Sequence, residues 1–277
     1  MSLECIDVSF AYGSNAAAVL RGCNISVSPG EIVVLAGANG CGKSTLLKAL
    51  AGLLSVQQGR VLCDGIELTQ LQPCERIAQV AWACQQPERQ LFAATALDDV
   101  MFGPLHLGLD VEEAQRRAQE ALRDFCIDSE RAAECAPFEF SGGEQRRIAL
   151  AGVVACGSHY LVLDEPFAGL DAEQRFNLGS QLKALAARGV GIALSCHDLA
   201  VALEYADVLA LMADGTIGAL GKPTELLEDA ELLKSCGLEQ PSLARIACRF
   251  DAPLGADVSV LAAELAERLG ANGQVGS

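Results

Sequence analysis

The segment Gly37-Ala38-Asn39-Gly40-Cys41-Gly42-Lys43-Ser44 has residue types and spacing that could bind a phosphate chain. It follows an apolar run, Ile32 to Ala36, and precedes a helix-forming stretch, Thr45 to Leu54. Such loops bind phosphate because their glycines let backbone N–H groups point inward, while the helix N-terminus adds positive potential. We expect Lys43 to reach the β- and γ-phosphates and Ser44 to ligate Mg²⁺. A chance glycine-rich turn is the weaker alternative.

Two adjacent carboxylates follow another apolar run and could complete a metal site. Asp164 and Glu165 come directly after Tyr160 to Leu163. An acidic residue at the end of a buried strand can hold Mg²⁺ through water, and its neighbour can polarise an attacking water. Two carboxylates could also simply end a strand. The phosphate-binding loop in the same chain favours the metal role for Asp164 and the water-polarising role for Glu165.

A second glycine-rich helix start lies between these two motifs. Phe140-Ser141-Gly142-Gly143-Glu144 precedes Gln145-Arg146-Arg147 and an apolar helical stretch. Unpaired N–H groups and the helix dipole attract anions at such a position. The chain therefore carries two candidate anion-binding sites.

The elements that must position these motifs predict an α/β fold. Short alternating runs in the first thirty residues, broken by turn residues, are typical of antiparallel strands. Ile32 to Ala36, Tyr160 to Leu163 and Gly191 to Ser195 are continuous apolar runs with helical stretches between them. That pattern predicts central strands of a parallel sheet that is covered on both faces.

Two further segments are predicted to be helical. Between about Gln86 and Ser158 the sequence is charged and alanine-rich, which indicates a helical insert. Thr95 to Asp98 fits a capping box at one helix start, and Val111 to Phe125 is amphipathic. Beyond about Gly221 the sequence changes again, and a last amphipathic helix is predicted from Val258, Leu261, Leu265 and Leu269.

Composition excludes several classes of protein. The 277 residues are 51% hydrophobic and 20% charged, which argues against disorder, and the net charge of −16 makes nucleic acid an unfavourable partner. No run of about 18 apolar residues predicts a membrane span, and no basic start predicts a signal peptide, so we expect a cytosolic location. The twelve cysteines include no CxxC pair, and we expect reduced thiols in the core.

Five motifs in order resemble those of an ATP-binding cassette (ABC) ATPase. The phosphate-binding loop (P-loop, Gly37 to Ser44) is followed by the Ser141-Gly142-Gly143-Glu144 segment, then by Leu161-Val162-Leu163-Asp164-Glu165-Pro166, Gly169-Leu170-Asp171 and Ser195-Cys196-His197-Asp198. The resemblance extends from Leu3 to about Lys222 and implies ATP and Mg²⁺ as cofactors. It implies a P-loop NTPase (RecA-like) core with an N-terminal antiparallel β-subdomain and an inserted α-helical subdomain.

The resemblance also implies domain boundaries. Residues 1–220 would form the ABC nucleotide-binding domain, with its helical subdomain at about 86–158. Residues 221–277 would form a small helical C-terminal extension, a candidate dimerisation element.

Roles for single residues follow from the resemblance. Tyr12 would stack on adenine, although an ordinary half-buried strand tyrosine is the alternative, and the loop from Gly37 to Thr45 would bind the phosphates. Gln85 would sense Mg²⁺ and the attacking water, and His197 would contact the γ-phosphate. His106 and His159 have no such setting.

Two cassettes of this family meet head to tail, which implies a shared site. Ser141, Gly142 and Gly143 would close over the nucleotide of the second ATPase subunit, which could be an identical or a paralogous chain. Asp171 would communicate across that interface. The sequence departs from the family pattern at Cys41, where serine is common, and at Glu144, where glutamine is usual; the added carboxylate could weaken the shared site.

A narrower resemblance concerns the stretch after Gln85. Gln85 to Phe92 and Thr95 to Pro104 are similar to the corresponding segments of energy-coupling factor ATPases, which power uptake of vitamins and of cobalt or nickel ions. Pro223 to Leu269 is similar to the extension of that subfamily. The resemblance implies a transmembrane coupling subunit, a substrate-binding membrane subunit and a peripheral location on the cytoplasmic face of the cell membrane.

The stretch Gln86 to Phe102 is the predicted docking surface for the membrane partner. It places Leu91 and Phe92, two apolar residues expected to be exposed, in a polar loop. The alternative is that both residues only anchor the helical insert to the sheet.

Other functions remain as alternatives. A soluble ABC ATPase acting on nucleic acid or ribosomes would need tandem cassettes or a long coiled-coil insertion, for which the chain has no room. The ATPase of a conventional ABC transporter is a second alternative. A regulator that binds nucleotide without hydrolysing it would be expected to lack Glu165 or His197, and both are present.

Overall fold

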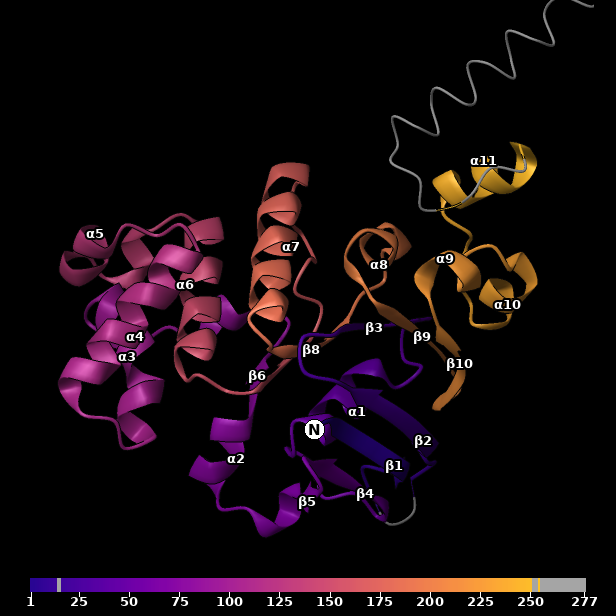
Figure 1. Cartoon of the computed structure of the whole chain (residues 1–277), viewed down its shortest axis with the longest axis horizontal. Helices are drawn as coiled ribbons and strands as arrows, with labels where there is room; N and C mark the ends of the chain where they lie inside the picture. The colour runs from indigo at the N-terminus through magenta and orange to yellow at the C-terminus, as the bar shows by residue number, and fades with distance from the viewer. Residues whose placement is uncertain (14–15, 251–253, 255–277) are drawn as a thin grey trace, which may run out of the picture.

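The computed structural model describes residues 1–13, 16–250 and 254, and its strands form two sheets (Figure 1). The four-stranded sheet has the order β2-β1-β4-β5, and its neighbouring strands are all antiparallel. Its strands are β1 (Leu3–Phe10), β2 (Leu20–Val27), β4 (Gln58–Cys63) and β5 (Ile66–Glu67). The antiparallel strands predicted for the first thirty residues are confirmed.

The six-stranded sheet has the order β10-β9-β3-β8-β7-β6. Neighbouring strands are parallel except β10 and β9, which are antiparallel. The strands are β3 (Ile32–Gly37), β6 (Val80–Ala83), β7 (Tyr160–Leu163), β8 (Gly191–Ser195), β9 (Val208–Ala213) and β10 (Thr216–Gly221). The predicted α/β fold with parallel central strands is confirmed. Parallel strands bring their carboxyl ends to one edge, so the motifs that follow β3, β6, β7 and β8 meet there.

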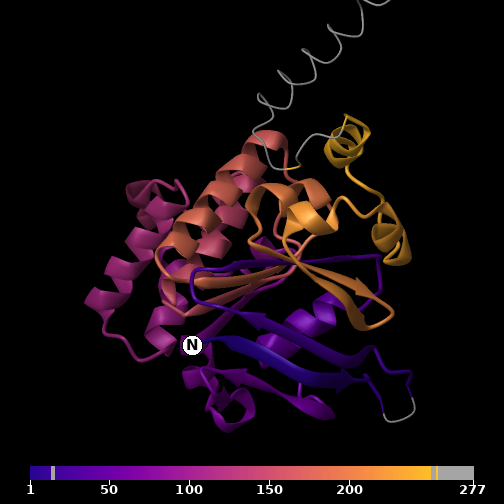
Figure 2. The ribbon, with the colours of Figure 1, turned by 45° about the vertical axis from the view of Figure 1, so that its right-hand side comes forward.

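The side chains of β3 alternate between two apolar cores. Val33 and Leu35 pack in the cluster that contains α1 (Lys43–Leu50) and the four-stranded sheet. Ile32 and Val34 pack on the other face with α7 (Ala172–Ala187) and α8 (Leu199–Tyr205). Figure 2 shows α7 and α8 on one side of the six-stranded sheet and the four-stranded sheet on the other. Burial on both faces explains why these strands read as continuous apolar runs.

The predicted helical insert is present and stands to one side of the sheets (Figure 1). It contains α3 (Ala96–His106), α4 (Val111–Asp124), α5 (Ser129–Glu134) and α6 (Gly142–Ala155). The amphipathic α4 buries Ala114, Ala118 and Leu122, as expected. Thr95 caps α3 by accepting a bond from the amide of Asp98, but the reciprocal bond of a capping box is not made by Asp98. Asp99 turns back instead, and its Oδ2 accepts bonds from the amides of Phe92 and Ala93.

Short helices complete the described chain. α2 (Pro73–Gln79) precedes β6, and the 3₁₀ turns Leu68–Gln70, Pro87–Gln90 and Pro137–Glu139 lie in the connections. After β10 come α9 (Pro223–Leu226), α10 (Ala230–Ser235) and α11 (Ser242–Phe250). The helix predicted from Val258 to Leu269 lies outside the described residues.

Two further observations concern the cysteines and the apolar character of the helices. All twelve cysteines are free thiols, as predicted, but Cys74, Cys126 and Cys248 are exposed and do not lie in the core. Within the described ranges, no helix combines the length and apolar character needed to cross a bilayer.

Candidate functional site

The P-loop connects the buried strand β3 to α1. Gly42, the N-cap of α1, has φ 112°, and a Cβ on it would lie 3.1 Å from the carbonyl oxygen of Val19. Only glycine fits there without strain. The buried Lys43 ammonium donates to the carbonyl oxygens of Gly37 at 2.8 Å and Ala38 at 3.1 Å. It therefore lies inside the curve of the loop, where loop N–H groups would bring a phosphate chain.

Asp164 joins the P-loop to the end of β7. Its Oδ1 accepts hydrogen bonds from Ser44 Oγ at 2.9 Å and from Ser195 Oγ at 2.7 Å. The predicted metal residues Ser44 and Asp164, 120 positions apart, are thus brought into contact. No cluster of three or more His, Cys, Asp or Glu occurs in the described part of the chain. One hydroxyl and one carboxylate fit Mg²⁺, which keeps several waters and uses substrate phosphates as further ligands.

Glu165 and His197 form a second contact at this sheet edge. The Nδ1–H of His197 donates to Glu165 Oε2 at 2.7 Å. The Glu165 backbone has φ 52°, a conformation that costs a non-glycine residue about 1–3 kcal/mol. Its amide donates to Ser195 Oγ at 2.8 Å, which helps to hold the backbone there. The carboxylate is mostly buried, and the imidazole is more than half exposed.

Gln85 emerges from the strand beside β7. β6 ends at Ala83, whose carbonyl oxygen accepts a bond from the amide of Asp164 at 2.9 Å. Gln85 follows two residues later and is exposed. Its position next to the Asp164 strand fits the predicted sensing role, and its side chain makes no hydrogen bond to the residues that the structure describes.

Tyr12 lies at the opening of the P-loop and is 60% exposed. Its hydroxyl is 3.2 Å from Thr45 Oγ1, and its ring meets Phe10 edge-on with centroids 5.0 Å apart. A half-buried strand tyrosine was the alternative to a ring that stacks on adenine. The exposure and the Thr45 contact favour the stacking role.

The Ser141-Gly142-Gly143 segment lies at a different place from the P-loop of the same chain. Ser141 caps α6, and Asp171 caps α7. Ser141, Gly143 and Asp171 line one cavity of about 260 Å³, whereas Asn39 and Gly40 line another. The two motifs therefore line separate cavities of the same chain.

Glu144 is engaged within its own chain. Its Oε2 accepts bonds from the Ser141 amide and hydroxyl, both at 2.8 Å, and its Oε1 lies 2.9 Å from Arg131 Nη1. The Ser141 amide and hydroxyl, followed by Arg131, hold the Glu144 pKa below its usual range. The added charge is thus partly neutralised where it stands.

Arg146 and Ser195 are functional candidates to which we assigned no role from the sequence. The buried Arg146 guanidinium donates to the carbonyl oxygens of Pro166 and Ala168, both at 2.8 Å, and of Glu165 at 3.1 Å. Burial lowers its pKa. It ties α6 to the chain that follows β7. Arg146 lies four residues before the buried Leu150 and so shares its face of α6. An arginine on the apolar face of a predicted helix was the sequence signal that could have identified it.

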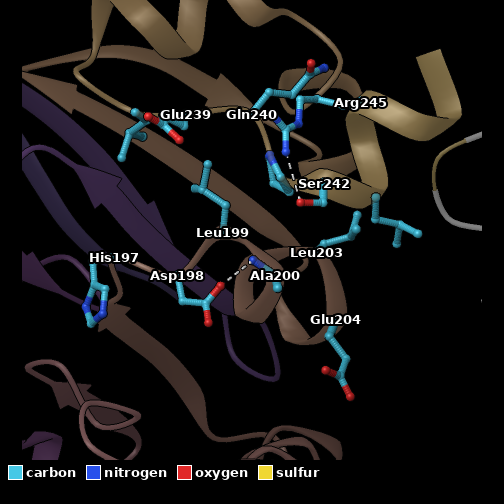
Figure 3. A pocket seen from close by; sticks show the side chains of 13 residues that line it. His197, Asp198, Leu199, Ala200, Leu203, Glu204, Glu239, Gln240, Ser242 and Arg245 are labelled. Carbon is cyan, nitrogen blue, oxygen red and sulfur yellow. Dashed lines mark hydrogen bonds between the residues drawn. The ribbon is translucent and has the colours of Figure 1, made fainter. Parts of the chain in front are cut away.

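A cavity of about 970 Å³ lies between α8 and the C-terminal segment (Figure 3). His197 and Asp198 are at one end, and Ser242 and Arg245 are at the other, joined by a bond of 3.1 Å. Asp198 Oδ1 accepts a bond from the Ala200 amide at 3.0 Å. The chain after Gly221 therefore lines the same cavity as His197.

Sequence comparisons identify relatives along most of the chain. A family model described as ABC transporter matches residues 20–168. The energy-coupling factor transporter ATP-binding protein EcfA of Methanocaldococcus jannaschii is 38% identical over 246 residues, which are 88% of this chain and 87% of that protein. EcfA2 of Caldanaerobacter subterraneus subsp. tengcongensis is 36% identical over 267 residues, 93% of each chain.

Two solved structures of ATP-binding cassette proteins are similar to this chain. CbiO1 from Clostridium perfringens, described as part of the ABC transporter complex cbiONQ, has a TM-score of 0.75 and 28% identity, covering 88% of this chain and 97% of that chain. The dimeric ATP-binding cassette MJ0796 in a post-hydrolysis state with ADP and Pi has a TM-score of 0.70 and 26% identity. That match covers 80% of this chain and 99% of MJ0796.

Proposed function

Because this chain belongs to the ABC transporter family as an ATP-hydrolysing, ATP-binding subunit, we propose that it drives an importer of the energy-coupling factor type. The observation that carries the proposal is the extent of the EcfA2 match, which covers 93% of both chains and so includes the helices after Gly221. The proposed cargo is a vitamin or a transition-metal ion. The relationship to cbiO1, part of the cbiONQ complex, supports this class.

The proposed active site is shared between two such ATPase subunits, identical or paralogous. Tyr12 and the P-loop of one subunit would bind ATP, and Ser141, Gly142 and Gly143 of the other would close over its phosphates, with Asp171 at the interface. The separate cavities of the two motifs and the dimeric form of MJ0796 support this arrangement. Closure excludes water other than the attacking molecule.

Within that site each side chain has a proposed task. Lys43 would neutralise charge on the β- and γ-phosphates, and Ser44, Asp164 and Gln85 would hold Mg²⁺, which when bound offsets developing phosphate charge. Glu165 would polarise the attacking water. The 2.7 Å bond from His197 would orient the Glu165 carboxylate while His197 contacts the γ-phosphate.

An apolar groove supports docking to a transmembrane coupling subunit. The groove has a volume of about 510 Å³, and Leu53, Ile77, Phe92 and Phe102 line it with large exposed side chains. Phe92 and Phe102 pack edge to face with centroids 4.9 Å apart. An apolar patch with a polar rim is the usual anatomy of a protein interface.

One part of the docking prediction is wrong. Leu91 is only 6% exposed and belongs to the core, because it packs beneath the loop as an anchor for the helical insert. Phe92 is 60% exposed and lines the groove. The proposed docking surface is therefore Phe92, Phe102, Leu53 and Ile77, which joins the insert to the chain around α2.

Purification through a tag on this chain from native membranes tests the proposal. We expect a membrane-embedded coupling subunit, a substrate-binding membrane subunit and a second ATPase subunit to copurify at the cytoplasmic face. Nucleic acid or ribosomes in their place would support the soluble alternative. A periplasmic binding component with ordinary permeases would support a conventional transporter.

A pair of variants makes the same experiment specific for the groove. Phe92→Ala should reduce copurification of the coupling subunit about tenfold while ATP binding by the isolated chain stays intact. Phe176→Ala removes an equally exposed phenylalanine, 61% exposed on α7, outside the groove, and should leave assembly unchanged. Equal copurification of both variants would contradict the docking assignment.

A further inference from the structure

A backbone contact joins the P-loop to the C-terminal helices. The amide of Ala38, the second residue of the P-loop, donates to the carbonyl oxygen of Cys236 at 3.2 Å. Cys236 is the C-cap of α10, and Gly237 follows it with φ 68°. We call Cys236 and Gly237 the α10 turn. Two segments almost 200 residues apart in sequence therefore meet at the loop that binds phosphate.

The α10 turn is close enough to constrain the P-loop sterically. A Cβ added to Gly237 would lie 2.9 Å from the Cβ of Ala38, a distance that real Cβ contacts essentially never show. The same residues line a cavity of about 570 Å³ together with Asn39 and Gly40. The turn thus forms part of the wall next to the loop.

Ala38 links this turn to the lysine of the site. Its carbonyl oxygen accepts a bond from Lys43 Nζ at 3.1 Å, while its amide is held by Cys236. A shift of the α10 turn would move the peptide units on both sides of Ala38 and with them an acceptor of the lysine. The contact between Ala38 and Cys236 therefore affects the conformation of the P-loop and the position of Lys43, both of which would contact a bound phosphate chain.

The turn itself is firmly anchored. Leu233 and Cys236 are buried in the same apolar cluster as Leu211 of β9. The other end of the P-loop has a separate support, because the Gly215 amide donates to the carbonyl oxygen of Cys41 at 3.0 Å. The loop is held on one side by the β9–β10 turn and on the other by the α10 turn.

We propose that the α10 turn is a positioning element for ATP binding, which acts through Ala38 on the P-loop and Lys43. The inference rests on the proposed P-loop site. Displacement of the turn should weaken nucleotide binding, because ATP would then have to restore the loop conformation as it binds. Turnover at saturating ATP should change little, since bound ATP selects the same loop conformation.

The test uses Gly237→Ala in the full chain, with Gly189→Ala as its matched control. Both glycines have positive φ, 68° and 93°, but a Cβ on Gly189 would meet nothing within 4 Å. We expect Gly237→Ala to raise the Kd and KM for MgATP about five- to tenfold with kcat within about twofold. Gly189→Ala should leave all three within about twofold. Equal Kd values in the two variants would overturn the proposal.

A rescue variant separates the contact from backbone strain. Ala38→Gly removes the Cβ that the new methyl group would strike and leaves the Ala38 Cα, at 4.0 Å, as the next atom. The double variant Ala38→Gly with Gly237→Ala should therefore bind MgATP within about twofold of Ala38→Gly alone. A persistent defect in the double variant would contradict positioning through this contact.

Hydrogen exchange on the unaltered protein keeps the test independent of variant folding. The Ala38 amide should exchange at least about tenfold more slowly than the amides of exposed P-loop residues without nucleotide. Equal exchange would overturn the proposed contact. Lys43→Ala separates this inference from its premise: if it leaves MgATP binding intact, the P-loop site is wrong, whereas if it abolishes binding while Gly237→Ala has no effect, only the positioning role fails.

Discussion

Ser195 offers a direct test of how the sheet edge organises catalysis. Its hydroxyl is fully buried, donates to Asp164 Oδ1 at 2.7 Å and accepts from the Glu165 amide at 2.8 Å. Ser195→Ala removes both bonds and adds no bulk. Asp164 keeps its bond from Ser44, but the Glu165 amide, whose residue has φ 52°, loses its acceptor.

The size of the effect follows from these contacts. A buried donor left without a partner costs about 1–3 kcal/mol, so we expect Ser195→Ala to lower the free energy of unfolding by about 2 kcal/mol. Release of the Glu165 backbone should misplace its carboxylate, and a loss of about 1.4–2.8 kcal/mol in transition-state stabilisation lowers kcat about 10- to 100-fold. The Kd for MgATP should change less than about threefold, because Lys43 and the loop remain in place.

Ser158→Ala is the matched control for this prediction. Ser158 is also buried, and its hydroxyl donates to the carbonyl oxygen of Ile77 at 2.6 Å, a contact that involves none of the proposed nucleotide-site residues. Denaturant unfolding should show a loss of about 1 kcal/mol with unchanged MgATP turnover. If Ser195→Ala is destabilised but hydrolyses MgATP as fast as Ser158→Ala, Ser195 has no role in positioning Glu165.

Three further predictions concern charged side chains. Lys43→Ala should abolish MgATP binding in a calorimetric titration, because the Lys43 ammonium is held inside the curve of the loop by the carbonyl oxygens of Gly37 and Ala38; retained micromolar binding would refute the site. Glu144→Gln should change turnover in the assembled complex less than about twofold, because Arg131 already pairs with the carboxylate, and a tenfold rise would mean that Glu144 faces the partner's nucleotide. Hydrogen bonds from Arg116 and Arg117 lower the pKa of Glu113 from 4.5 to about 2, so its contribution to α4 is complete above about pH 4.5 and is lost as the pH falls toward 2. Glu113→Gln should lessen that acid-dependent loss of helical circular dichroism, and an identical acid transition in both proteins would contradict it.

The sequence was most informative where burial and chemistry agree. The continuous apolar runs that became β3, β7 and β8 identified a sheet buried on both faces, and parallel order then placed their carboxyl ends together. The contact between Ser44 and Asp164 follows from that order. The glycines of the P-loop were equally predictable, because the loop must curl at a defined point.

Side-chain direction in loops was less predictable. Leu91 and Phe92 are adjacent and similar in hydrophobicity, yet one is buried and the other is exposed, because only the packing of the insert decides which side faces the core. At the start of α3, Asp98 does not make the return bond of the predicted capping box, whereas its neighbour Asp99 accepts bonds from the amides of Phe92 and Ala93. The direction of Glu144 depends on Arg131, 13 residues away in sequence.

Contacts between distant backbone groups leave no pattern in the sequence. The bond from Ala38 to Cys236 joins a backbone amide to a backbone carbonyl group, and every residue except proline carries both groups. Arg146 donates to three backbone carbonyl groups in the segment after β7, and any residue type could supply such an acceptor. Such contacts emerge only when the sheet and the helices are in place.

Turnover of MgATP by the complex purified from membranes through this chain is the most direct test of its role as the hydrolysing subunit of a membrane importer. The wild-type complex should contain a membrane-embedded subunit and hydrolyse MgATP. The Glu165→Gln complex should have the same composition, retain ATP and hydrolyse it at least about 100-fold more slowly. A purified chain without any membrane-embedded subunit, or a Glu165→Gln complex with wild-type turnover, would contradict this role.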